Sequence, residues 1–159
     1  MKRLASLILL LAAPAFARDA LGVHDGWGAF RDARPPRCFA LAEPVRKRNG
    51  QWRPFASIAH WPTRRVRGQL HIRLSREKRA NAPVTLSIDG RRFGLVAGRT
   101  DAWGPDPRTD AAIIAAMRSA RSMTVSTTAA NGARFADSYA LKGAATAIDA
   151  AALGCARQR

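Results

Sequence analysis

Carboxylates and histidines are scarce in this chain, and that scarcity limits the chemistry it can perform. Its 159 residues include 11 acidic side chains, with Glu43 and Glu77 as the glutamates, and three histidines, His24, His60 and His71. A pair of carboxylates of the glycosidase type therefore has little support. The chain contains no HxH or HExxH pattern, GxSxG elbow, phosphate-binding glycine loop or calcium-binding loop. These absences argue against an enzyme, and we expect neither a metal nor a cofactor.

Long apolar runs are also missing, except at the start of the chain. Two basic residues precede an almost uninterrupted apolar stretch over residues 4–13, and Ala15-Phe16-Ala17 fits the small-x-small rule for signal-peptide cleavage. The stretch is too short for a membrane anchor, because roughly 20 apolar residues are needed to cross a bilayer. We therefore predict a signal peptide over residues 1–17, no transmembrane segment after its cleavage, and a single β-rich domain over residues 18–159 that is periplasmic or secreted.

Cysteine is rare as well, since the chain has only Cys38 and Cys155. In the oxidising compartment to which a signal peptide leads, an even number of cysteines favours one disulfide. Closing a loop of that length would stabilise the fold by about 4–5 kcal/mol in the chain-entropy model. The alternative is two free thiols. A metal site is not expected, because no second cysteine or histidine stands at ligand spacing beside either residue.

Positive charge is abundant and unevenly distributed. The chain carries 27 Lys and Arg against 11 acidic residues, a net charge of +16, and residues 31–79 alone hold 14 basic and three acidic side chains. Such a surface attracts lipopolysaccharide, anionic lipid headgroups or nucleic acid. Nucleic acid is not expected in the compartment of an exported protein. A competing interpretation is compositional, because Arg outnumbers Lys 23 to 4, which a GC-rich genome produces without selection for binding.

The order of apolar and turn-forming residues predicts a mainly β protein. Leu70, Ile72 and Leu74 alternate with polar residues, as in a half-buried antiparallel strand. Asp89-Gly90 and Asn131-Gly132 tolerate positive φ and predict hairpin turns. About eight strands are expected, at residues 26–32, 38–44, 54–61, 66–75, 84–88, 123–128 and 134–141, with a return strand through Phe93 and Leu95.

Two helices complete the predicted fold. The first covers residues 110–120, with Thr109 or Asp110 as its N-terminal cap. The second is an Ala-rich helix over residues 143–155, which Gly154 is expected to end, and residues 101–110 are predicted to form a loop. Because hairpins dominate, the predicted fold is an antiparallel β-sandwich or curled sheet with one or two packed α-helices.

Aromatic and basic residues suggest a binding surface. Trp27, Trp52, Trp61 and Trp103 could stack on ligands, although core packing is the commoner use of tryptophan, and Trp27 and Phe30 are expected to pack inside. Trp52 lies in RKRNGQWR, where basic and aromatic side chains mix as they do at sites for phosphate-bearing partners. The candidate binding residues are Arg46, Lys47, Arg48, Trp52, Arg53, Arg64, Arg65 and Arg67, and Arg31, Arg34 and Arg37 are further candidates for outside contacts.

Four stretches carry a family resemblance. They are a strand ending in Ile88-Asp89-Gly90, a helix with a basic exit over Ala111–Arg121, an LxGxxxAIDA helix over Leu141–Ala150, and WGAFRD followed by RCFAL. With these features the chain resembles the invasion-associated locus B family of alphaproteobacterial envelope proteins. The resemblance implies an exported, β-rich, non-enzymatic protein, linked in some members to host-cell invasion, and it supplies no binding residues. Members often have more than one cysteine pair, whereas this chain has one.

These features favour a non-enzymatic cell-envelope protein that uses a basic surface to contact anionic envelope components or another envelope protein. Two alternatives stay open. One is a small periplasmic enzyme or inhibitor with a site assembled from His60, His71 and nearby acids. The other is a structural envelope protein whose charge is only compositional.

Overall fold

The computed structural model describes residues 18–46 and 53–156, so the predicted signal peptide lies outside the described residues. This part of the chain forms ten strands: β1 (Arg18–His24), β2 (Trp27–Ala33), β3 (Pro36–Ala42), β4 (Phe55–Trp61), β5 (Val66–Arg73), β6 (Val84–Ile88), β7 (Arg91–Ala97), β8 (Asp101–Trp103), β9 (Ser122–Thr128) and β10 (Arg134–Ala140). The helices are α1 (Pro107–Met117) and α2 (Ala144–Ala156), and a short 3-10 helix, η1 (Pro62–Arg64), joins β4 to β5. Neither of these α-helices is long and apolar enough to cross a bilayer.

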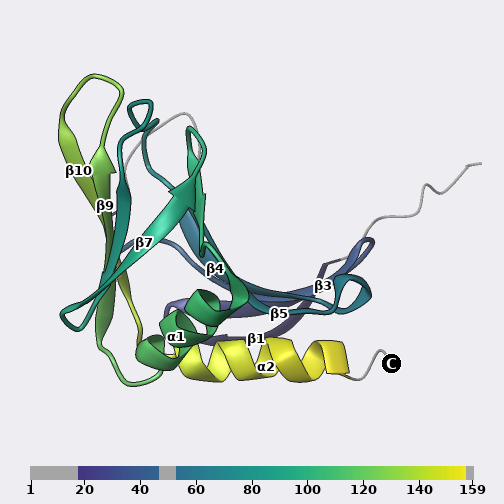
Figure 1. Ribbon diagram of the computed structural model, residues 1–159. Coiled ribbons are helices and arrows are strands. Elements are labelled where there is room, and N and C mark those ends of the chain that lie inside the picture. The colour runs from purple at the N-terminus through teal and green to yellow at the C-terminus, as the bar shows by residue number, and fades with distance from the viewer. Residues whose placement is uncertain (1–17, 47–52, 157–159) are drawn as a thin grey trace, which may run out of the picture.

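The ten described strands form one antiparallel sheet in the order β1-β2-β3-β4-β5-β8-β7-β6-β9-β10. The sheet is curled, so that β1–β5 form one wing and β6, β7, β9 and β10 form the other (Figure 1). Helix α2 packs against β1–β4, and α1 packs against β5 and β6. The prediction of a mainly β, antiparallel curled sheet with packed helices is confirmed.

The β6–β7 hairpin shows how the sequence pattern builds this sheet. Val84, Leu86 and Ile88 of β6 are buried, and the residues between them are half-buried. Asp89 and Gly90 form the two-residue turn with φ of 47° and 78°. A tight hairpin needs positive φ at both turn positions, which Asp and Gly adopt more readily than most residues. Both the predicted alternation and the predicted turn are confirmed.

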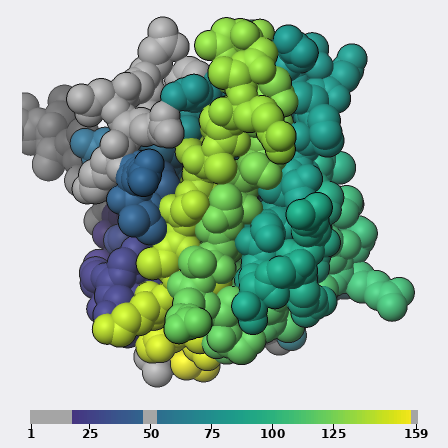
Figure 2. Space-filling view, turned by 90° about the vertical axis from the view of Figure 1, so that its left-hand side faces the viewer, coloured from purple at the N-terminus to yellow at the C-terminus, as the bar shows by residue number. Residues whose placement is uncertain are grey.

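Trp27 joins the two wings of the sheet. Its side chain is fully buried, and its indole Nε1 donates a hydrogen bond of 2.8 Å to the carbonyl oxygen of Ala140, at the end of β10. Nearby, the Val45 amide donates to the Ser138 carbonyl oxygen at 2.8 Å, so β10 lies beside the segment that follows β3 (Figure 2). The prediction that Trp27 packs inside is confirmed.

Two strands go beyond the predicted set. β8 lies in the stretch predicted to be a loop, and its three residues are extended because β5 and β7 pair with them from both sides. Trp103, for example, faces His71 on one side and Val96 on the other. β1, whose sequence RDALGVH shows no sustained alternation, extends the sheet by pairing with β2. In both strands, pairing with neighbours outweighs a weak local signal.

Helix α1 begins earlier than predicted. Its first residue is Pro107, and the Asp106 side chain caps it by accepting a hydrogen bond of 2.7 Å from the Thr109 amide. The predicted caps are therefore wrong. Asp110 is instead buried, where it accepts a hydrogen bond of 3.1 Å from the Leu70 amide and so connects α1 to β5. Burial raises the pKa of Asp110, despite that hydrogen bond.

Helix α2 ends later than predicted, because Gly154 lies within it and the helix continues to Ala156. A glycine fits here because the helix passes close to β1. A Cβ at this position would lie 2.5 Å from Leu21 Cδ1. Gly154 therefore permits close packing and does not end the helix, which places the last turn of α2 beside the end of the sheet.

Candidate functional site

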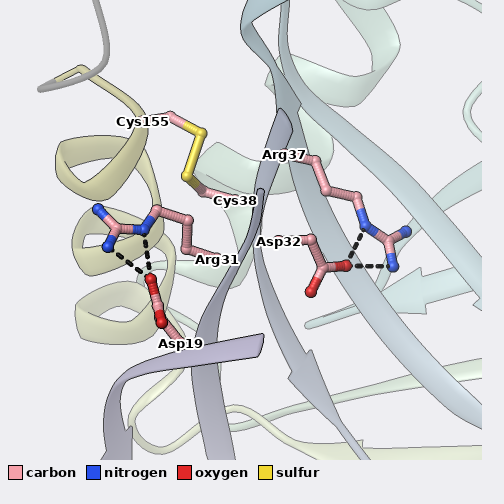
Figure 3. The surroundings of a disulfide bond; sticks show 6 residues. All are labelled: Asp19, Arg31, Asp32, Arg37, Cys38 and Cys155. Atoms are coloured by element: carbon pink, nitrogen blue, oxygen red, sulfur yellow. Dashed lines mark hydrogen bonds and ion pairs between the residues drawn. A yellow bond between two sulfur atoms is a disulfide. The ribbon is translucent and has the colours of Figure 1, made fainter. Parts of the chain in front are cut away.

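The disulfide fixes the last turn of α2 to the sheet. Cys38 of β3 and Cys155 of α2 are bonded, with their Cα atoms 5.7 Å apart and 117 positions apart in the sequence (Figure 3). Both side chains are buried together with Ala151. The predicted bond is confirmed, and it holds one end of α2 over the end of the sheet where β3 begins.

Arginines gather at this same end of the sheet. In an antiparallel sheet the start of one strand lies beside the end of the next, so β1, β3 and β5 begin here and β2 and β4 end here. We call this region the basic end. Its arginines are Arg18, Arg31, Arg34, Arg37, Arg64, Arg65 and Arg67, and its described carboxylates are Asp19 and Asp32.

The two carboxylates of the basic end neutralise part of this charge. Arg31 pairs with Asp19 at 2.5 Å on the α2 side of the sheet, and Arg37 lies 2.8 Å from Asp32 on the opposite side (Figure 3). Arg18 also lies 2.8 Å from Asp32. Partial burial raises the pKa of Asp32, but hydrogen bonds from its two arginines outweigh that effect and hold the pKa below its ordinary value. Asp32 is therefore charged at neutral pH, and both carboxylates are occupied by arginines.

Four arginines of the basic end stay without a carboxylate partner among the described residues: Arg34, Arg64, Arg65 and Arg67. The last three are exposed: Arg64 ends η1, Arg65 follows it, and Arg67 is the second residue of β5. Arg34 is exposed in the β2–β3 turn. This set provides the positive charge that an outside ligand could meet.

Aromatic rings lie between several of these guanidinium groups on the face opposite α2. Arg37 lies 4.6 Å from the ring centroid of Phe39 and 5.4 Å from that of Trp61, and Arg64 covers Trp61 at 5.1 Å. Arg18 adds a further contact at 5.1 Å from Phe39. Contacts of this kind stabilise by about 0.5–1 kcal/mol each at exposed sites. They restrict where the guanidinium groups can point.

A groove of about 920 Å³ opens beside the basic end, between the β4–β5 connection and the last turn of α2. Arg65, Val66 and Arg67 line it from the sheet, and Leu153 and Cys155 line it from the helix. Leu153 is 63% exposed, although it is a large apolar residue. The groove therefore combines cationic and apolar walls.

His60 also lines this groove, from the α2 side of β4 and directly opposite Cys38. Burial lowers the pKa of His60, and the charge of Arg67 lowers it further, so the ring is neutral at neutral pH. Its Nε2 atom is buried and has no hydrogen-bond partner among the described residues. The positive charge of the groove therefore comes from Arg65 and Arg67.

His71 lies on the opposite face of the sheet from His60. It faces Ser57, three positions before His60 on β4, and an odd offset along a strand reverses the face. His71 Nε2 lies 2.8 Å from Asp101 Oδ1, and its ring stacks on Trp103 with centroids 5.3 Å apart. The two histidines do not form the single pocket that the enzyme alternative requires. Within residues 18–46 and 53–156, no three His, Cys, Asp or Glu side chains group together to hold a metal ion.

The candidate binding residues fall into two separate groups. Arg64, Arg65 and Arg67 lie at the basic end, whereas Arg46 and Arg53 lie at the other end of β4, about 20 Å away for a seven-residue strand. Lys47, Arg48 and Trp52 lie outside the described residues.

Sequence reasoning missed the groove itself. Leu153 carried no signal beyond its place in an Ala-rich helix, and nothing in the sequence placed that helix beside the β4–β5 connection. The predicted disulfide was the clue to this wall, because it requires the end of α2 to lie against β3.

Comparison with known proteins gives one family and one solved structure. The family model described as invasion associated locus B (IalB) protein matches residues 31–152. The crystal structure of invasion associated protein B from Bartonella henselae is similar in fold, with a TM-score of 0.60 and 16% sequence identity, over 87% of this chain and 98% of that one. No curated protein matches the sequence. Because the family model covers most of the chain and bears out the resemblance seen in the sequence, this protein belongs to the IalB family.

Proposed function

We propose that the protein is exported and acts at the cell envelope as a non-catalytic interaction protein whose basic end binds phosphate-bearing headgroups with a net negative charge. The observation that carries the proposal is the set of arginines that the described carboxylates leave unpaired, Arg34, Arg64, Arg65 and Arg67. Guanidinium groups form charge-assisted hydrogen bonds with phosphate oxygens, often two at a time. Lipopolysaccharide and acidic phospholipids share that group and are the expected partners.

Export is supported by features from both ends of the chain. Residues 1–17 have the pattern of a secretory signal peptide. A buried disulfide such as Cys38–Cys155 persists in oxidising compartments and is rare in the cytosol. The Bartonella protein of similar fold is named for its association with invasion, and an envelope location fits such a role.

The test is binding of the processed protein to vesicles of neutral phosphatidylcholine with and without phosphatidylglycerol. The test variant is R64Q/R65Q/R67Q. The matched control is R92Q/R121Q/R134Q, which removes the same charge from exposed arginines outside the basic end. Each arginine near an anionic surface contributes about 1 kcal/mol, so the test variant should bind roughly a hundredfold more weakly than the control.

The salt concentration and the lipid composition of the vesicles distinguish specific binding by the basic end from the compositional alternative. Binding should weaken between about 20 mM and about 300 mM salt, because exposed charges are screened. Vesicles with lipopolysaccharide in place of phosphatidylglycerol identify the preferred source of the phosphate. Equal binding by both triple variants would favour the compositional alternative, and no binding at low salt would overturn the proposal.

A further inference from the structure

We propose that the groove between the β4–β5 connection and the last turn of α2 is a binding site for a single-chain anionic amphiphile, with its headgroup on Arg65 and Arg67 and its acyl chain along Leu153. This inference deepens the proposed function, on which it rests, by naming the ligand class and the cavity. A volume of about 920 Å³ lies within the range of known small-molecule sites, roughly 300–1,000 Å³.

The charge of the groove selects an anionic headgroup. Two guanidinium groups line it, and no carboxylate is among the described residues that line it. His60 is neutral there, because burial and the nearby Arg67 lower its pKa. The last carbonyl groups of α2 carry partial negative charge, but two full positive charges outweigh them. A carboxylate or phosphate group therefore fits this wall better than a neutral headgroup does.

The apolar wall selects an acyl chain. Leu153 exposes 63% of its surface beside Ala152 and Ala156 of α2, and Val66 lines the facing side. Covering such a leucine removes apolar surface from water, which favours binding. A headgroup alone would leave this wall uncovered, whereas an acyl chain would cover it.

Both walls of the groove are held in place before a ligand arrives. The disulfide ties Cys155 to β3, so the last turn of α2 cannot move away from the sheet. On the facing side, the Arg65 amide donates a hydrogen bond of 3.1 Å to the Pro62 carbonyl oxygen, which closes η1. A site built in advance loses less conformational entropy on binding.

The experiment is calorimetric titration of the processed, oxidised protein with dodecanoate and with dodecyl phosphate, both below their micelle-forming concentrations. Dodecyl maltoside serves as the neutral comparison, and butyrate as the anion without a chain. The wall variant is L153Q, and its matched control is V96Q, which changes another exposed apolar residue on β7, away from the groove. Urea unfolding confirms that each variant is folded.

We expect dodecanoate or dodecyl phosphate to bind at least about tenfold more tightly than dodecyl maltoside and butyrate. L153Q should weaken that binding about tenfold, R65Q/R67Q should weaken it at least as much, and V96Q should leave it unchanged. Equal binding of charged and neutral detergents, or equal effects of L153Q and V96Q, would overturn the inference.

Vesicle binding separates a failure of this inference from a failure of the proposed function. L153Q keeps every arginine of the basic end, so it should bind anionic vesicles as well as the wild type does. Vesicle binding without any dodecanoate or dodecyl phosphate binding would overturn the groove as an amphiphile site and leave the proposed function standing. Amphiphile binding with Leu153 dependence supports the groove whatever the vesicle result.

Discussion

Removing the disulfide between Cys38 and Cys155 tests how the last turn of α2 is held to the sheet. The bond joins residues separated by 117 positions, and the chain-entropy model gives a loop of that length about 5 kcal/mol of stabilisation at 25 °C. Alanine at both positions removes the bond without leaving a free thiol. Because α2 also buries Ala144, Ala147 and Ile148, we expect C38A/C155A to fold. Its free energy of unfolding should fall by most of the roughly 5 kcal/mol that the bond contributes.

The assay is reversible urea unfolding of the processed protein, with the reduced wild type as a second sample without the bond. The reduced protein keeps both sulfur atoms, so its loss of stability contains no cavity contribution. In thermal unfolding of the same samples, a loss of about 5 kcal/mol lowers the melting temperature of a domain of this size by roughly 10–20 °C. Both samples should show losses of this order.

The comparison between the reduced wild type and the alanine variant shows what causes the loss of stability. A loss of less than about 1 kcal/mol in both would refute the loop-closure argument. A loss in the alanine variant alone would assign the effect to packing around the sulfur atoms. Free thiols in the mass spectrum of the unreduced mature protein would refute the bond itself.

Other changes test local parts of the structure by the same unfolding assay. Gly143 has φ of 84° and a Cβ there would overlap the His24 carbonyl oxygen, so Gly143→Ala should cost more than about 2 kcal/mol, whereas Gly94→Ala, with nothing within 4 Å, should have little effect. Asp32→Asn should cost about 1 kcal/mol at pH 7, because partial burial raises the pKa of Asp32 but its two arginines bring it below the ordinary value. That contribution is present above the unfolded pKa of about 3.9 and is lost as the pH falls through the folded value, so the stabilities of the two proteins should converge in acid; a constant difference would contradict this. Trp27→Phe removes the hydrogen bond between the wings and should cost about 1–3 kcal/mol.

The strands that could be predicted are those with a signal inside their own sequence. Leu70 and Ile72 of β5 alternate with polar residues, and both are fully buried. β8 has only three residues and is extended because strands pair with it on both sides. The helix ends show the same limit. The start of α1 has a local signal, because Asp106 before Pro107 is a typical N-terminal cap. The role of Gly154 in α2 has none, because it depends on close packing against Leu21, which is far away in the sequence.

The candidate site was predictable as a list of arginines but not as a surface. Arg64, Arg65 and Arg67 lie within four residues of the sequence and stay together in the structure. Arg46 and Arg53 are separated from them by the whole length of β4, a consequence of where that strand begins and ends. The groove depends on where the last turn of α2 lies relative to the β4–β5 connection, and this is set by tertiary packing and the disulfide.

The most direct test of the proposed function is hydrogen exchange of the processed protein with and without anionic vesicles at low salt. The account predicts slower exchange on vesicles at the amides of Ala33, Arg34, Arg37 and residues 63–67, which belong to the basic end, and unchanged exchange in β7 and β9. Protection centred on β7 and β9, or the same pattern with neutral vesicles, would contradict the claim that unpaired arginines at this end bind the envelope surface.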